Sequence, residues 1–136
     1  MNLDDLRAVL ADQHHGVIAT YRPSGGVQLS PVLVSLDAED RVIISSRQGA
    51  YKVRNLRRDP RVFVCVLPDS FFGNWIQVDG TGSILDLPDA MDALIDYYRR
   101  TSGEHSDWDE YRAAMEDEQR VLIRIDIERI GPNRSG

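Results

Sequence analysis

The sequence of 136 residues has one cysteine, Cys65, no apolar run near the length of a membrane span, and no overall excess of positive charge. A single cysteine excludes an intramolecular disulfide framework and provides no cysteine cluster for a metal. A membrane-spanning helix needs about 20 consecutive apolar residues, so no span is expected. A formal net charge of −6 argues against a general nucleic-acid binder, because a phosphate backbone requires a broad basic face.

The chain also lacks internal repeats and low-complexity linkers, and 42% of its residues are hydrophobic and 28% charged. This composition is typical of an ordinary globular protein, and we predict a single domain over residues 1–136. The opening Met1–Asp5 is acidic and unlike a secretory leader, which makes the cytoplasm the expected location. Cys65 lies within an apolar run and is expected in the core.

A basic stretch interrupts this acidic chain. Residues 47–61 carry six Lys or Arg side chains against one acid, a local charge of +5, so the rest of the sequence sums to −11. The apolar run Val42–Ser46 precedes the stretch, and Gly49-Ala50 suits a turn into a helix. The first N–H groups of a helix lack internal partners and lie at the positive end of its dipole, so the pattern favours a site for a small anion. The alternative is a basic helix that only faces solvent.

Periodicity predicts the secondary structure along the chain. Six strands are expected, at residues 16–22, 27–35, 41–46, 61–67, 74–85 and 119–130. Helices are expected at residues 2–13, after Gly49-Ala50 as far as Asp59-Pro60, at residues 87–101, and after a cap at Ser106 or Asp107. Short turns join most of the strands and the helices do not alternate with them, which excludes a doubly wound parallel sheet. We predict a mainly β (α+β) fold, a six-stranded antiparallel Greek-key barrel with peripheral helices.

Two strand positions indicate irregular pairing. Pro31 cannot donate to a ladder, so its strand is expected to be an edge, to be bulged, or to be held open by a ligand. Gly80 and Gly82 indicate a bend or bulge in the long strand 74–85. Elsewhere, His14 and His15 have no third ligand spaced near them, and no metal site is predicted. Residues 86–118 contain eleven acids and three Arg, most of them expected on a solvated face.

Four stretches together resemble one known family: Gly16–Thr20, Gly25–Pro31, Lys52–Arg61 and Gly103–Arg112. In order and spacing they resemble the pyridoxamine-phosphate-oxidase-like superfamily of FMN-binding split β-barrels, and more narrowly its actinobacterial branch that uses the deazaflavin coenzyme F420. The resemblance covers nearly the whole chain. It implies a homodimer with cofactors in grooves between the barrels and a cytoplasmic oxidoreductase that acts on a small molecule, with no nucleic-acid or membrane partner.

The resemblance also implies where the cofactor would lie. The tricyclic ring is expected against the strand Gln28–Val32, which explains Pro31, and the phosphate and anionic tail against the strand end Ser45–Arg47 and the basic helix. Lys52 is the leading phosphate ligand, Asn55 shares its helix face, and Arg54 points toward the tail or solvent. The full set of expected cofactor-binding residues is Gln28, Ser30, Pro31, Val32, Ser45, Ser46, Arg47, Tyr51, Lys52, Arg54, Asn55 and Trp75.

Three functions remain open from the sequence. The first is an F420H2-dependent reductase that passes hydride to a planar, conjugated acceptor; orientation and exclusion of water then carry the catalysis, and no catalytic side chain is assigned. The second is an FMN-dependent oxidase or reductase of the same fold, since both cofactors carry a ribityl phosphate. The third is a carrier of F420, or of a flavin-like or tetrapyrrole-like ligand, without turnover. Trp75 is expected either beside the ring or substrate, or in core or dimer packing.

Overall fold

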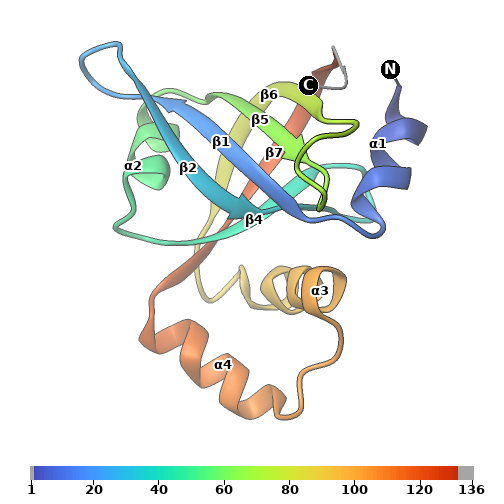
Figure 1. Cartoon of the computed structure of the whole chain (residues 1–136). Helices are drawn as coiled ribbons and strands as arrows, with labels where there is room; N and C mark the ends of the chain where they lie inside the picture. The colour runs from blue at the N-terminus through green and yellow to red at the C-terminus, as the bar shows by residue number, and fades with distance from the viewer. Residues whose placement is uncertain (1, 132–136) are drawn as a thin grey trace.

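The computed structural model describes residues 2–131, which form four helices and seven strands (Figure 1). In chain order they are α1 (Leu3–Leu10), β1 (His15–Tyr21), β2 (Val27–Leu33), β3 (Ser35–Leu36), β4 (Val42–Arg47), α2 (Tyr51–Arg58), β5 (Arg61–Leu67), β6 (Ile76–Leu85), α3 (Met91–Ser102), α4 (Trp108–Asp117) and β7 (Arg120–Ile130). None of the helices within this range combines the length and apolar character that a membrane crossing demands.

The strands form one antiparallel sheet in the order β2-β1-β5-β6-β7-β4-β3. The two ends of this order, β2 and β3, are consecutive in the chain and are separated only by Val34. The sheet must therefore curl until its ends meet, which produces a barrel. Because β2 is not hydrogen bonded to β4 as a neighbouring strand, the barrel remains split between them. The predicted fold class, a mainly antiparallel barrel with peripheral helices, is confirmed.

The structure has seven strands where the sequence predicted six, because the expected strand at residues 27–35 divides. Its first part, β2, pairs with β1. The Val34 N–H then donates to the His14 carbonyl oxygen at 2.7 Å, and the next two residues, β3, pair with the start of β4 instead. The sequence does not reveal such a change of partner, because the choice of partner depends on closure of the whole sheet and not on a local pattern.

The unusual residues of β2 and β6 match their predicted roles. Pro31 lies in an end strand whose register with β1 runs unbroken from Leu33 to Val27, so the edge alternative is correct and there is no bulge. In β6 the register with β7 shifts between Asp79 and Gly80, as predicted. A Cβ atom at Gly80 would overlap the carbonyl oxygen of Asp126, so only glycine allows this close approach of the two backbones.

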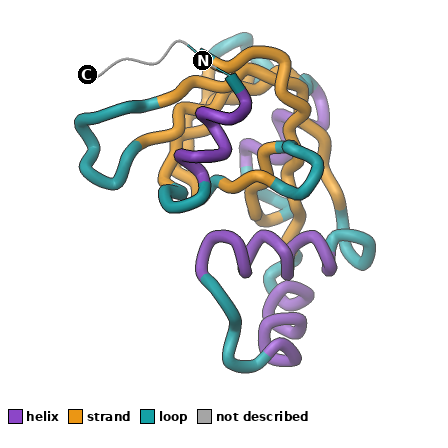
Figure 2. Tube along the Cα trace, turned by 90° about the vertical axis from the view of Figure 1, so that its right-hand side faces the viewer, coloured by secondary structure: helices purple, strands orange, loops and turns teal. Residues whose placement is uncertain are grey.

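Two hydrophobic clusters lie on opposite sides of β4 and β7. Along β7, Ile123 and Ile125 point into the barrel, whereas Leu122 points outward to α3 and α4. Buried side chains of α1 and α2 join the barrel cluster, and Figure 1 shows these helices at opposite ends of the barrel. The pair α3 and α4 lies to one side of the strands (Figure 2). It has its own core, which includes Leu94. Where α3 and α4 cover them, β4 and β7 thus bury side chains on both faces of the sheet.

Most helix boundaries agree with the sequence. Asn2 caps α1 through a reciprocal pair of hydrogen bonds with Asp5, and Asp107 caps α4 by accepting from the Glu110 N–H at 3.1 Å. The basic helix α2 ends at Arg58, before Asp59-Pro60. The third helix begins at Met91 rather than at residue 87, because residues 87–90 form a turn before it.

Cys65 was expected in the core, and this expectation is wrong. It is half-buried on the outer face of β5, because strand alternation points its neighbours Val64 and Val66 into the barrel instead. Partial burial raises the pKa of the Cys65 thiol. An all-apolar run such as residues 62–67 has no period from which the inward face can be read.

Candidate binding groove

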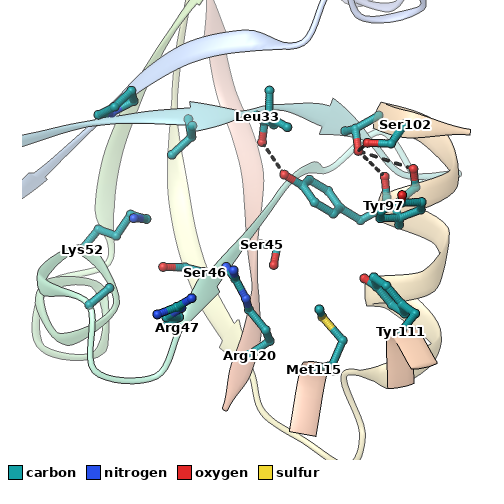
Figure 3. Close-up of a pocket in the computed structure, with 15 residues that line it drawn as sticks. Leu33, Ser45, Ser46, Arg47, Lys52, Tyr97, Ser102, Tyr111, Met115 and Arg120 are labelled. Carbon is teal, nitrogen blue, oxygen red and sulfur yellow. Dashed lines mark hydrogen bonds between the residues drawn. The ribbon is translucent and has the colours of Figure 1, made fainter. Parts of the chain in front are cut away.

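A groove of about 570 Å³ opens at the split of the barrel, a volume typical of small-molecule sites. One wall is formed by β2, another by the end of β4 and the start of α2, and the third by α3 and α4 (Figure 3). The residues that line it are Pro31, Val32, Leu33, Ser45, Ser46, Arg47, Ala50, Lys52, Tyr97, Tyr98, Thr101, Ser102, Tyr111, Met115 and Arg120.

One end of the groove is cationic. Lys52 on α2, Arg47 at the end of β4 and Arg120 at the start of β7 all point toward it (Figure 3). Glu118 pairs with Arg120 at 2.8 Å and with Arg47 at 3.1 Å. Two of the three cations therefore share one carboxylate, which leaves an excess of positive charge at this end.

Lys52 is the cation with the least compensation. Within residues 2–131 its ammonium forms no ion pair, and its hydrogen bond is to the Ser30 hydroxyl at 3.3 Å. Partial burial, and secondly the charge of Arg120, lower the pKa of Lys52. A buried charge held beside another of the same sign is unfavourable unless an anion lies near both. The geometry therefore favours an anionic ligand at this end.

The opposite end of the groove is aromatic. Tyr97 from α3 faces Tyr111 and Met115 from α4 (Figure 3), and Tyr98 also lines the groove. Tyr98 and Tyr111 also contact His105 and Trp108. The ring centroids within this group of four residues lie 5.1–5.8 Å apart. Burial raises the pKa of Tyr111 to about 12, so its hydroxyl is neutral at pH 7. Such a wall suits a flat, conjugated ligand.

The wall formed by β2 presents backbone groups to the groove. The backbone carbonyl of Leu33 accepts a hydrogen bond from the Tyr97 hydroxyl at 2.9 Å. The backbone carbonyl of Leu29 accepts one from the side-chain amide of Gln28 at 3.3 Å. Both carbonyls therefore point away from β1. Backbone direction repeats every second residue, so the Pro31 carbonyl points to the same open edge. The missing N–H of Pro31 consequently costs no ladder hydrogen bond.

Six of the twelve residues expected from the sequence line the groove: Pro31, Val32, Ser45, Ser46, Arg47 and Lys52. Ser30 lies next to them, because it accepts from Lys52. Gln28 is farther along β2 and accepts from Arg22 at 3.1 Å.

The other four expected residues lie outside this lining. Asn55 is buried, and its amide donates to the Thr20 hydroxyl at 3.1 Å, so it ties α2 to β1 instead of pointing into the groove. Tyr51 and Arg54 are exposed on α2, and Trp75 is half-buried just before β6. Arg120 and the tyrosines of α3 and α4 were missed. The sequence marks the Gly103–Arg112 run, but nothing in it shows that α3 and α4 face β2.

A curled antiparallel sheet with helices at its ends and a cationic and aromatic groove at its split defines the class of split-barrel proteins with an oxidoreductase-like fold. The sequence profile of the family described as pyridoxamine 5'-phosphate oxidase matches residues 3–133. The chain belongs to this family.

Solved structures share this fold at low sequence identity. A conserved hypothetical protein from Mycobacterium tuberculosis has a TM-score of 0.81 and 20% identity, over 99% of this chain and 85% of that one. An F420 reductase has a TM-score of 0.72 and 20% identity, over 92% and 94%. The heme storage protein HutZ from Vibrio cholerae has a TM-score of 0.75 and 16% identity, over 100% and 98%. These likenesses establish the fold alone.

Proposed function

We propose that this protein is a reductase that uses the reduced deazaflavin F420 to transfer hydride to a planar, conjugated small molecule. The observation that carries the proposal is the half-buried ammonium of Lys52, which has no carboxylate partner in the described chain and lies at the cationic end of a groove whose other end is aromatic. A phosphorylated tricyclic cofactor has the same polarity, with anionic groups at one end and a flat ring at the other. The F420 reductase of similar fold supports this choice.

The residues of the groove fit such a cofactor. Lys52 and Arg47, with the nearby Ser46, would hold the phosphate, and the open edge of β2 at Pro31 would accept a hydrogen bond from the ring. When bound, the reduced deazaflavin supplies the hydride. The protein orients the acceptor and excludes water through the tyrosine wall. No side chain is assigned as an acid or base, because the hydroxyls of Tyr97 and Tyr111 both donate to backbone carbonyls.

Two alternatives to an F420-dependent reductase can be tested in the same experiments. An FMN-dependent oxidase or reductase would use the same cationic end, because FMN also carries a ribityl phosphate, and the family description favours an oxidase. A carrier without turnover is favoured by the similar fold of a heme storage protein. A protein that purifies yellow from a common host would indicate FMN, whereas F420 is absent from such hosts. Tight binding without oxidation of reduced F420 across a panel of acceptors would indicate a carrier.

We also propose a homodimer, on the basis of an exposed apolar face. Leu29 is 63% exposed, and Phe71 and Phe72 in the loop after β5 are 62% and 72% exposed. Leu29, Pro31 and the half-buried Cys65 point from the same outer face of the sheet, since β2, β1 and β5 are paired in register. Exposed apolar side chains of this kind favour association. Light scattering after size exclusion is expected to give twice the mass of one chain.

The first experiment is a calorimetric titration with F420, with FMN in parallel, for the native protein and for Lys52→Ala. We expect tight F420 binding and a loss of about ten- to a hundredfold in Lys52→Ala, because a hydrogen bond to a charged group is removed. Arg112→Ala removes an exposed charge from α4, away from the groove, and is expected to bind as the native protein does. Unchanged F420 affinity in Lys52→Ala would contradict the assignment of the cationic end. Preference for FMN would favour the flavin-dependent alternative.

A further inference from the structure

Two arginines of the groove lie directly opposite each other in the sheet. Arg47, the last residue of β4, is in register with Arg120, the first residue of β7. Like charges at opposite positions of a strand pair repel each other. One carboxylate oxygen, Oε1 of Glu118, lies against both guanidinium groups: it accepts from Arg47 at 3.1 Å and from two nitrogens of Arg120, at 2.8 and 3.2 Å. The hydrogen bond from Arg120, and to a smaller extent that from Arg47, lowers the pKa of the Glu118 carboxyl, which is therefore ionised at pH 7.

The backbone around Glu118 is fixed by the turn that joins α4 to β7. Glu118 caps the end of α4, and its N–H donates to the Ala114 carbonyl at 2.9 Å. The next residue, Gln119, has a φ of 52°, in the left-handed region that residues other than glycine rarely adopt. Its carbonyl accepts from the Gln48 N–H at 2.9 Å, which ties the turn to the segment after β4. Such a conformation persists only where the surrounding structure holds it, so the turn keeps Glu118 beside Arg120.

The cationic end therefore contains an anion of its own. Lys52, Arg47 and Arg120 together with Glu118 leave two positive charges there. A phosphate group is anionic at pH 7, and it would meet the cations and this carboxylate at the same time. Glu118 already occupies guanidinium N–H groups that a phosphate would use, and it repels any anion that approaches them.

We propose that Glu118 is a specificity-determining residue: it is an internal counter-ion that competes with the ligand phosphate for Arg47 and Arg120, and so limits how strongly the groove prefers a phosphorylated ring. This rests on the proposed function, in that the phosphate is that of the cofactor. Each hydride transfer leaves an oxidised cofactor, and its exchange for a reduced one requires release. Changes in affinity at one site act mostly on the dissociation rate, so the competing carboxylate speeds this exchange.

Glu118→Gln removes the negative charge and keeps the shape of the side chain. The amide oxygen of Gln can still accept from the arginines, so this variant is expected to fold. Glu110→Gln is the matched control, because Glu110 is an exposed residue in the first turn of the same helix, outside the lining of the groove. Both variants change the net charge of the protein by the same amount, and only the first does so beside Arg47 and Arg120.

The test is a calorimetric titration with F420, FMN and riboflavin, which has the ring of FMN without its phosphate. In Glu118→Gln we expect F420 and FMN to bind at least about fivefold more tightly, the effect of removing one like charge a few Å away through water. Stopped-flow displacement is expected to show F420 release slowed by a similar factor. Riboflavin affinity in Glu118→Gln, and the affinity of all three ligands in Glu110→Gln, should change by less than about twofold.

Unchanged or weaker binding of F420 and FMN in Glu118→Gln would overturn the proposal, because the carboxylate would then serve only to hold the arginines in place. An equal gain in Glu110→Gln would overturn it as well, since the cause would be the net charge of the whole protein. So would an equal gain for riboflavin, since the effect would then act on the ring and not on the phosphate.

A second probe separates this proposal from the proposed function. A native protein that binds neither F420 nor FMN would overturn the function, but inorganic phosphate would still test the counter-ion. In an NMR titration that follows the Nε–H signals of Arg47 and Arg120, we expect phosphate to bind at least about fivefold more tightly to Glu118→Gln than to the native protein. Equal phosphate affinity in the two proteins would overturn the counter-ion role by itself.

Discussion

The two sides of the groove differ in what they present and in how they are held. The barrel side, formed by β2, β4 and α2, presents backbone edges and the cations Arg47 and Lys52, and its two strands are held by pairing with β1 and β7. The helical side, formed by α3 and α4, presents the rings of Tyr97, Tyr98 and Tyr111, which are held in a separate hydrophobic cluster. The positive charge of the groove thus lies on the barrel side, and most of its aromatic rings lie on the helix pair.

The barrel and the helix pair are therefore stabilised in different ways. The barrel is stabilised by pairings between strands far apart in the chain, so loss of one pairing affects the whole sheet. The helix pair is inserted between β6 and β7 and lies outside the sheet (Figure 2). It packs on the sheet through Ile43 and Leu122. We expect it to loosen without unfolding the barrel, since small packed units open independently when few contacts join them to the rest.

The largest expected effect comes from breaking the barrel at its bulge. Gly80→Val would place a side chain against the Asp126 carbonyl and the Ile125 side chain, and the two backbones must separate to admit it. We expect a loss of at least about 4 kcal/mol in the free energy of unfolding, enough to unfold both sides of the groove. Urea denaturation followed by circular dichroism measures it.

Gly49→Ala is the control for Gly80→Val, because a Cβ atom at Gly49 meets nothing within 4 Å. Its unfolding free energy is expected to stay within about 0.5 kcal/mol of the native value. A Gly80→Val protein with native stability would show that the close approach of β6 and β7 is not needed, and the proposed dependence of the barrel on this pairing would be wrong.

A smaller effect, confined to one side, is expected when the helix-pair core is opened. Leu94→Ala removes a fully buried side chain from that cluster and should cost about 3 kcal/mol, as should Ile123→Ala in the barrel cluster. Hydrogen exchange distinguishes them: Leu94→Ala is expected to speed exchange in α3 and α4 only, and Ile123→Ala throughout the sheet. If both variants speed exchange everywhere, the two sides form one cooperative unit and the comparison fails.

The smallest effect is a gain. Lys52→Met removes an ammonium whose pKa is lowered by burial and by Arg120, so it should raise the unfolding free energy at pH 7 by up to about 1 kcal/mol while reducing cofactor affinity. The native chain loses its Lys52 proton below the usual value of 10.5, earlier than the unfolded chain does, so native stability rises with pH through that window. The advantage of Lys52→Met should therefore disappear as the pH rises past 10.5.

Thermal denaturation at pH 7 and at high pH measures this difference, with Arg54→Met as the control on the exposed face of α2. Because Arg54 is not in the groove, its replacement should give no comparable gain. A Lys52→Met protein less stable than the native one at pH 7 would mean that the ammonium is compensated in the folded state, and the case for an anion at this end would weaken.

Much of the groove could be predicted from the sequence, and the failures have physical causes. Lys52 and Arg47 were found because the basic stretch is local, and Pro31 because a proline restricts strand pairing. Asn55 was assigned to the groove by its place on the helix face, but the face of Lys52 is wide enough that Asn55 turns inward to Thr20. Arg120 was missed because nothing local distinguishes it from the other arginines.

The amino-acid sequence by itself determined most of the elements: where most strands and helices run, where the basic helix begins and ends, and which strand has restricted pairing. These depend on periodicity, caps and proline, which act over a few residues. Only the tertiary structure decided which side chains meet. Curling of the sheet brings Leu33, Ser45 and Tyr97 to the lining of one groove, although they come from three separate elements. Strand register and closure of the barrel are set by the packing of the whole core, so no local pattern encodes that meeting.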